Sequence, residues 1–258
     1  MNVKFLKTNN ENKLSFILSD AYPEIANALR RALISEVPVM AISRVDFVGN
    51  NSALYNEMVA LRLGLLPLKS NVSTYVMPSE CSCKGKGCAK CSVKLTLEVK
   101  GPGMVYARDL ISSDSSVIPV NPDTPIVKLF EGQAVKLEAV AVLGTGGEHA
   151  RFNACMASYQ YYPKISGSCD CKTAVGVCPK GVLEFKDKKV NVIDLEACDL
   201  CLACVDACTC GKLKVEGRSD KFIFNIESWG QYEPKELVQA GINSILTRLT
   251  ELSEKTKE

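Results

Sequence analysis

The cysteines of this sequence fall into groups whose spacing suits metal ligation. All but one of the 13 cysteines lie in two regions, 81–91 and 169–210. In a reducing compartment, clustered thiols are more often metal ligands than disulfide partners. Cys155 stands apart from both groups, and we expect it to be a small buried side chain.

The densest group lies in the segment ACDLCLACVDACTC, residues 197–210. Cys198, Cys201, Cys204 and Cys208 form the run C-x2-C-x2-C-x3-C. This is the spacing of ferredoxins that bind a cubane cluster, in which the fourth cysteine ligates the other cluster of a pair. Three thiolates on one tight loop can each reach a different iron of one cube, so the run predicts an iron–sulfur site.

A half-repeat supplies the fourth ligand of that site. CPKGVLEF at 178–185 aligns with CTCGKLKV at 208–215, and Cys178 matches Cys208. Ligation across the two halves then predicts one 4Fe-4S cluster, with zinc or disulfides as the alternatives. The four predicted ligands are Cys178, Cys198, Cys201 and Cys204.

Extending this alignment towards the N-terminus shows that the other half of the repeat is incomplete. It places Ser168, Cys171 and Ala174 opposite the cysteine triplet, so that only Cys171 keeps its place. The remaining thiols could converge on a second, irregular cluster, on zinc, or in a disulfide that substitutes for a lost cluster. These thiols are Cys169, Cys171, Cys208 and Cys210.

A separate group lies in CSCKGKGCAKC at 81–91. Gly85 and Gly87 permit the sharp loop that folds one pair of cysteines onto the other. Four thiolates on so short a loop suit a closed, tetrahedral structural zinc, with a mononuclear iron site or disulfides as the alternatives. The predicted zinc ligands are Cys81, Cys83, Cys88 and Cys91.

The elements that carry these groups follow from apolar periodicity. Ile25, Leu29 and Leu33 share one face of a helix that begins near Pro23 and ends before Pro38. VKLTLEV at 93–99 alternates as a half-buried strand does, and further strands are expected at 105–110, 134–143 and 221–230. Residues 164–214 are rich in cysteine and glycine, and a region of this size normally needs a metal to fold.

A long helix is predicted from residue 233 to the end. Val238, Ile242, Ile245, Leu249 and Leu252 are spaced as in a heptad seam, which Leu246 widens. Such a stripe packs either on the protein's own core or against a partner helix. Its terminal position and charged end favour a partner.

Composition excludes several classes of protein. The 258 residues are 47% hydrophobic and 23% charged, as in ordinary soluble proteins, and the net charge of +2 argues against a strongly cationic nucleic-acid binder that acts alone. No apolar run approaches the roughly 20 residues that span a bilayer. The N-terminal residues lack the apolar core of a signal peptide, so we expect a cytoplasmic protein with no membrane association.

Catalytic signatures are missing from the sequence. His149 is the single histidine, and we expect it to be structural. GTGGEHAR at 144–151 lacks the Gly-Lys-Ser/Thr ending of a phosphate loop, and no dinucleotide fingerprint follows a strand. Acidic residues show no paired-carboxylate pattern. We therefore expect no catalytic residues in this chain.

Segments outside the cysteine groups carry a family resemblance. NALRRALISEVPVMAISRVDFVGNNSALYNEMVALRLGLLPL at 27–68 closely resembles the archaeal RNA polymerase D subunit. That family is related to the third-largest subunit of eukaryotic RNA polymerase II and to the bacterial α subunit. Further similar segments are GGEHARFNA, SYQYYPKI and FIFNIESWGQYEPKELVQAGINSIL, so the resemblance covers nearly the whole chain in order.

The resemblance implies an α+β fold with two insertions. Residues 1–38 and 215–258 would form an α-subunit-like dimerisation domain from both chain ends. A mixed, strand-rich domain at 39–163 would be inserted between them and would carry the four-cysteine zinc loop at 81–91. A ferredoxin-like iron–sulfur domain would occupy 164–214.

The resemblance also implies a function in transcription. The chain would be a non-catalytic assembly platform of a DNA-dependent RNA polymerase, a nucleotidyltransferase whose magnesium site lies on the large subunits. It would pair with the small subunit L as a heterodimer, then join the large catalytic subunits and the small subunits N and P, and meet DNA only through the whole complex. The expected partner face is Leu29, Leu33, Ile242, Ile245, Leu249 and Leu252.

The alternative function is a ferredoxin-type electron-transfer subunit of an oxidoreductase, which uses the same cysteine run. Such carriers usually keep two intact clusters or a redox partner domain. Here one half-site has lost its register, and the chain has no flavin or nicotinamide signature. These features favour the polymerase function.

Overall fold

The computed structural model describes residues 1–167 and 170–257. Contacts divide the chain into two compact units. The first consists of Met1–Arg30 and Ala157–Ile226, and the second of Arg31–Met156 and Glu227–Glu258. Each unit joins an early segment to a late one. This division runs across the domains expected from the sequence, and those domain boundaries stay a prediction.

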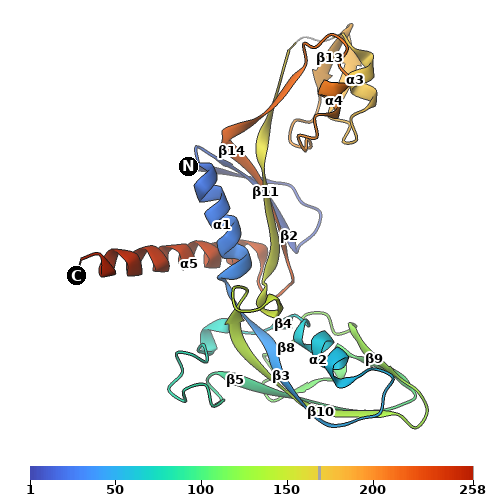
Figure 1. Ribbon diagram of the computed structural model, residues 1–258, viewed down its shortest axis with the longest axis vertical. Helices are drawn as coiled ribbons and strands as arrows, with labels where there is room; N and C mark the ends of the chain where they lie inside the picture. The colour runs from blue at the N-terminus through green and yellow to red at the C-terminus, as the bar shows by residue number, and fades with distance from the viewer. Residues whose placement is uncertain (168–169, 258) are drawn as a thin grey trace. The chain divides into compact units, whose positions relative to one another are not determined.

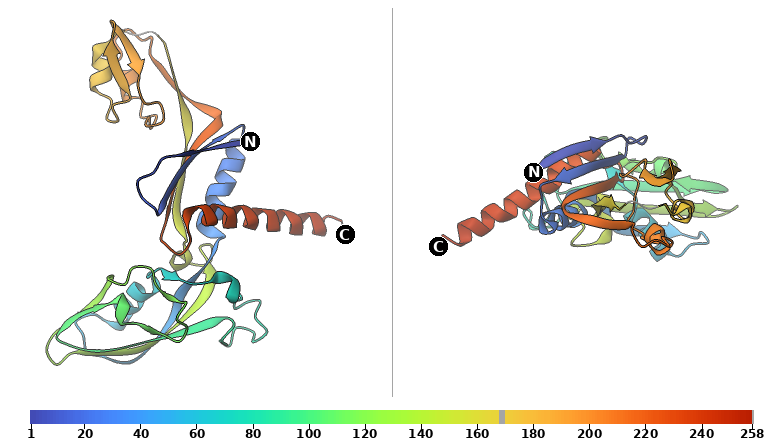
Figure 2. Two further views of the ribbon diagram at one scale, coloured as in Figure 1. Left: turned by 180° about the vertical axis from the view of Figure 1, so that it is seen from behind. Right: turned by 90° about the horizontal axis from the view of Figure 1, so that it is seen from above.

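The first unit is built on a four-stranded sheet in the order β1-β2-β14-β11 (Figures 1 and 2). Its aromatic core includes Phe16 stacked on Phe224 at 5.0 Å between ring centroids, with Tyr159 edge-on to Phe222. The strand expected at 221–230 is confirmed over 221–228, where it is part of β14. The strand bounds are β1 Asn2–Leu6, β2 Lys13–Ser19, β11 Cys155–Ser166 and β14 Lys214–Ser228.

The cysteine-rich part of this unit has short elements and a small core of its own. Half of the buried members of that core are cysteines, alongside Ala174, Val182, Leu183 and Leu213. So few apolar side chains bury little surface, which agrees with a segment that needs a metal to fold. The elements are α3 Lys172–Gly176, β12 Leu183–Lys186, β13 Lys189–Val192 and α4 Ala203–Asp206.

The second unit contains a four-stranded sheet in the order β3-β10-β5-β7. In β5 the alternate residues Val93, Leu95 and Leu97 are buried, so the predicted alternation is confirmed. Helix α2 (Asn56–Gly64) contributes Val59 and Leu63 to the same core. The sheet strands are β3 Pro38–Asn50, β5 Ser92–Lys100, β7 Ile111–Ser112 and β10 Ala134–Thr145.

Two further pairs of strands complete this unit. β4 pairs with β8 and β6 with β9, all antiparallel. The run expected as a strand at 105–110 forms only the end of β6 and then a short 3-10 turn at Ala107–Asp109. The bounds are β4 Leu68–Lys69, β6 Gly103–Tyr106, β8 Ile118–Pro119 and β9 Pro125–Leu129.

The two longest helices match the expectation from periodicity. α1 covers Pro23–Ser35 and α5 covers Pro234–Lys255. Within the second unit, the end of α1 packs on α5, because Leu33 fills the space above Gly241. Within the described part of the chain, no helix is long and apolar enough to cross a membrane.

Candidate metal centres and partner face

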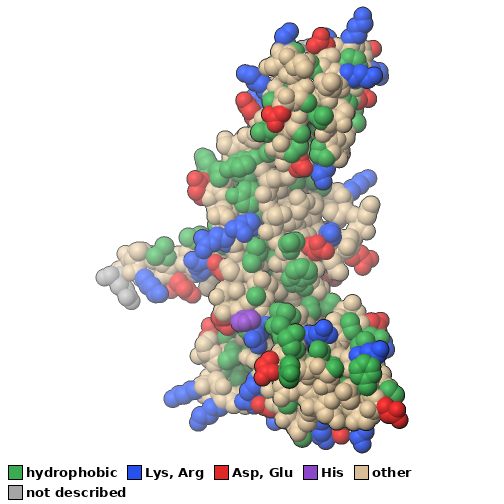
Figure 3. All heavy atoms as spheres, turned by 45° about the vertical axis from the view of Figure 1, so that its right-hand side comes forward, with side chains coloured by type: hydrophobic (Ala, Val, Ile, Leu, Met, Phe, Trp, Pro, Cys, Tyr) green, Lys and Arg blue, Asp and Glu red, His purple; other side chains and the backbone are tan. Residues whose placement is uncertain are grey.

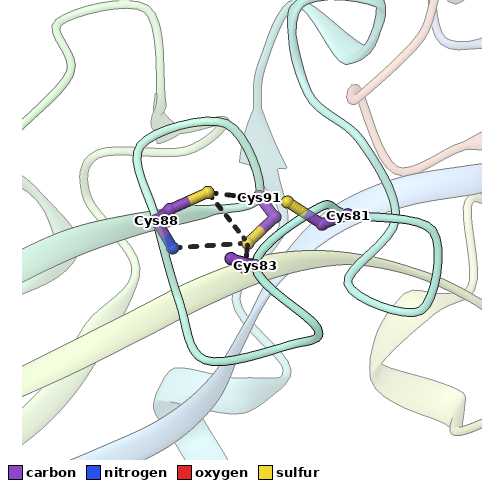
Figure 4. A group of neighbouring side chains, drawn as sticks. All are labelled: Cys81, Cys83, Cys88 and Cys91. Carbon is purple, nitrogen blue, oxygen red and sulfur yellow. Dashed lines mark hydrogen bonds between the residues drawn. The ribbon is translucent and has the colours of Figure 1, made fainter.

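Four thiols converge from the two arms of the loop at 81–91, and we call them the loop tetrad: Cys81, Cys83, Cys88 and Cys91 (Figure 4). The sulfurs of Cys81 and Cys88 lie 3.5 Å apart, those of Cys83 and Cys91 3.5 Å, and those of Cys88 and Cys91 3.7 Å. A Zn–S bond of about 2.3 Å in a tetrahedron places the sulfurs roughly 3.8 Å apart. The loop tetrad therefore fits a single thiolate-bound ion.

Backbone conformation explains how so short a loop brings these thiols together. Lys84, Gly85 and Gly87 all have positive φ, a region that glycine enters without a steric cost. The prediction that the two glycines shape the loop is confirmed. The backbone N–H of Cys88 also donates to Sγ of Cys91 at 3.4 Å, and such a donor favours the charged thiolate.

The thiols of the loop tetrad also bias one another's protonation. Hydrogen bonds from the Cys81 and Cys91 thiols lower the pKa of Cys83 to about 6. At Cys91 the Cys88 N–H lowers the pKa, but burial and neighbouring thiols outweigh it and raise the pKa to about 12. The loop therefore offers a thiolate at neutral pH, and a bound metal would displace the remaining protons.

A second group of thiols, the wide tetrad, lines one pocket in the first unit: Cys178, Cys198, Cys201 and Cys204. Apolar side chains, Ile165, Val182 and Leu183 among them, complete the lining. Within the described residues, no three of these sulfurs lie within 4.8 Å of one another. This spacing is too wide for one ion, whereas the thiolates of a cubane bind four different irons and must lie further apart.

Local backbone geometry points the wide tetrad into its pocket. Leu200 and Leu202 both have positive φ, at 61° and 65°, in the loop that carries Cys198, Cys201 and Cys204. Non-glycine residues in this conformation are strained and concentrate at functional sites. No feature of the sequence marks these leucines, because side chains of this kind normally avoid that region.

The sheet of the first unit holds the ligand loop in place. Gln160 on β11 donates from Nε2 to the carbonyl of Cys198 at 2.9 Å. A Cβ at Gly217 on β14 would lie 2.6 Å from Cβ of Tyr161 on β11, so glycine lets these two strands approach each other closely. The sequence does not identify Gln160 or Gly217 as residues that support the site, because both make contacts that depend on tertiary structure.

Two thiols of the wide tetrad have a raised pKa. Burial raises the pKa of Cys198, and the negative charges of Asp199, Cys178 and Cys201 add to that effect. Burial, followed by the charges of Cys178 and Cys198, also raises the pKa of Cys204. Burial thus favours the protonated form of Cys198 and Cys204, so a metal centre must displace those two protons to bind.

A third group, the close triad, brings together Cys171, Cys208 and Cys210. The sulfurs of Cys208 and Cys210 lie 3.3 Å apart, and those of Cys171 and Cys208 lie 3.9 Å apart. The hydroxyl of Thr209 is 3.2 Å from Sγ of Cys171. The structure thus assembles three of the four thiols named for a second site, and Cys169 lies outside the described residues.

The expected partner face divides between buried and exposed positions. Leu29 and Leu33 are buried within this chain, and Ile245 is half-buried. Leu246, Leu249 and Leu252 are 55%, 57% and 59% exposed, and Ile242 is 37% exposed. Figure 3 shows apolar side chains (green) between charged ones towards the end of α5. The exposed part of the seam is therefore its C-terminal part.

The remaining residues singled out from the sequence have structural contacts. His149 is exposed (purple in Figure 3), and its Nδ1 accepts from the N–H of Arg151 at 3.1 Å at the start of a 3-10 turn. Cys155 is buried, and its Sγ donates to the carbonyl of Leu33 at 3.4 Å. Burial raises the pKa of Cys155 to about 12, so its thiol is protonated at neutral pH.

The comparisons with known proteins identify relatives over most of the chain. Residues 45–158 match the family model of the RNA polymerase Rpb3/RpoA insert domain. The chain is 39% identical over 248 residues to DNA-directed RNA polymerase subunit Rpo3 of Methanosarcina acetivorans, covering 94% of this chain and 93% of that protein. It is 38% identical to Rpo3 of Archaeoglobus fulgidus, covering 95% and 94% of the two chains.

A eukaryotic relative extends the match. DNA-directed RNA polymerase II subunit rpb3 of Dictyostelium discoideum is 38% identical over 282 residues, covering 97% of this chain and 93% of that protein. Together with the insert-domain match, these relatives define a polymerase subunit of the Rpb3 class. Within that class, the chain belongs to the RNA polymerase Rpo3 family. The expectation of an RNA polymerase subunit is confirmed, and Rpo3 is the name that its archaeal relatives carry.

Proposed function

We propose that this chain is a non-catalytic assembly platform of a DNA-dependent RNA polymerase. The observation that carries the proposal is a match to Rpo3 subunits along nearly the full length of both proteins. The loop tetrad would use all four positions of a zinc ion, which leaves none for a substrate. Catalysis and its magnesium would then belong to the large subunits, and the chain would meet DNA only through the complex.

The partner that meets α5 is proposed to be the small subunit L. In the described part of α5 after Ile245, every residue is exposed, including three leucines. Isolated helical segments shorter than about 12–15 residues are marginal in water, so an apolar partner surface would stabilise the exposed end of α5. The resulting heterodimer would then recruit the large subunits with N and P, in the cytoplasm.

The metal centres are proposed to stabilise the fold. The wide tetrad would hold one 4Fe-4S cluster, and the loop tetrad would hold zinc. Because the cysteine-rich segment has a core made half of cysteines, metal binding would supply much of its folding free energy.

Pairing with L is tested on the exposed seam. The double variant Leu249→Asp/Leu252→Asp should abolish a one-to-one complex in size-exclusion chromatography after co-expression with L. The unfolding temperature of the isolated chain should stay close to wild type, because both leucines are exposed in it. Asn243→Asp/Thr247→Asp adds the same charge on another face of α5 and should keep the complex. Unimpaired pairing of the leucine variant would show that the seam is not the L interface.

A further inference from the structure

The close triad differs from the wide tetrad in the size of the group it can hold. Its Sγ–Sγ distances of 3.3 and 3.9 Å lie near the roughly 3.8 Å between thiolates around one tetrahedral zinc ion. All three of its sulfurs lie within 4.8 Å of one another, as in the loop tetrad and unlike the wide tetrad. The two halves of one cysteine-rich segment therefore present sites of different dimensions.

The half-repeat explains why this site is small. Position 174, which matches the ligand Cys204 of the wide tetrad, is a fully buried alanine. Position 168, which matches Cys198, is a serine in the sequence. Two of the positions that hold a cubane in one half thus lack a thiol in the other. Cys210 adds a sulfur with no counterpart, since Lys180 is its match in the half-repeat.

The chemistry of the close triad suits a thiophilic ion. Cys208 and Cys210 are separated by one residue, the same C-x-C spacing as Cys81 and Cys83 in the loop tetrad. The Thr209 hydroxyl can donate to a Cys171 thiolate and so supports its negative charge. A disulfide has an S–S length of about 2.05 Å and uses two sulfurs, whereas three converge here at larger distances.

We propose that the close triad holds a single zinc ion in the place where a second cluster would otherwise be expected. Cys171, Cys208 and Cys210 would supply three of the four ligands of this ion. The cysteine-rich segment then has one redox-active centre and one redox-silent metal. This proposal is independent of the polymerase function. Metal content tests the zinc site, and subunit composition tests the polymerase function.

The test is metal and acid-labile sulfide analysis of the full chain purified without oxygen. Cys208→Ser/Cys210→Ser should lose one zinc per chain and keep wild-type iron and sulfide. The matched control Cys83→Ser/Cys88→Ser should lose one zinc from the loop tetrad instead. Unchanged zinc in the first variant, or wild-type protein with iron and sulfide for two clusters, overturns the proposal.

A second measurement covers the case in which the Cys208/Cys210 variant misfolds and loses its iron as well. X-ray absorption at the zinc edge on the Cys83→Ser/Cys88→Ser protein observes the remaining zinc with the close triad intact. The expected spectrum has a sulfur shell at about 2.3 Å and no iron neighbour. The proposal fails if this protein contains no zinc or if its zinc has no sulfur shell.

Discussion

At the residue scale, the spacing of cysteines in the sequence carried most of the information about the sites. The loop tetrad is assembled as its C-x-C-x4-C-x2-C spacing predicts, with sulfurs at distances suited to one ion. Zinc there stays a proposal, and its ligand set is testable one cysteine at a time. Cys155 supplies a natural control, because it is buried, bonds to a backbone carbonyl and, among the described residues, belongs to none of the thiol groups.

Cys83→Ser should lose one zinc per chain and leave the iron content unchanged, since a serine hydroxyl is a poor substitute for a thiolate ligand. Cys155→Ser, in contrast, should keep every metal. Elemental analysis of the two purified proteins gives the comparison. Equal zinc in both variants would mean that the loop tetrad does not bind the ion.

Other residue-scale features could not be predicted from the sequence. Leu200 and Leu202 have a backbone conformation that leucine rarely adopts, so only the folded loop reveals their role. Gln160 bonds a carbonyl that is 38 residues away in the chain. Such contacts form only when the strand and the loop pack together in the folded chain, and local residue patterns do not encode them.

At the element scale, periodicity correctly predicted α1, β5 and α5 but not which chain covers each apolar face. Leu33 and Leu249 both lie on apolar helix faces in the sequence. In the structure Leu33 is buried within this chain and Leu249 is exposed. Burial depends on what packs against the helix, and a stripe of leucines looks the same for a core as for an interface.

The packing of α1 on α5 makes a sharp prediction at Gly241. A Cβ added there would lie 2.8 Å from Cδ2 of Leu33, which is fully buried, so one of the two side chains would have to shift within the core. Gly241→Val should therefore lower the free energy of unfolding by about 1–3 kcal/mol through overpacking. Thermal unfolding measured by circular dichroism should show a fall of several degrees.

The control for this variant is Gln239→Val, which places the same β-branched side chain at an exposed position of α5. Its effect should stay within about 0.5 kcal/mol, as for most surface substitutions. Equal unfolding temperatures for the two variants would show that the Leu33–Gly241 contact does not limit the stability of the helix pair.

At the scale of the whole molecule, the cysteine-rich segment and the exposed seam of α5 lie in different compact units. Cys201→Ser/Cys204→Ser should therefore unfold residues 164–214 locally, because the wide tetrad loses two ligands and the segment has little apolar core of its own. Pairing with L should survive. Hydrogen exchange with mass spectrometry would locate the unfolding, and size-exclusion chromatography would report pairing.

Failure of this variant to pair with L would contradict the modular account. The matched comparison is the Cys155→Ser protein, which should show wild-type exchange in residues 164–214 and wild-type pairing. Assembly with the large subunits could still weaken in the cluster variant, and that is measured by the recovery of complete polymerase.

The central claim is that this chain is an assembly platform of RNA polymerase, and the most direct test is the subunit composition of its native complex. The tagged full-length chain, purified without oxygen from the organism that produces it, should bring down the large catalytic and the small polymerase subunits in equal amounts, as quantified by mass spectrometry. Recovery of dehydrogenase or other oxidoreductase subunits without polymerase subunits would contradict the account and favour the electron-transfer function.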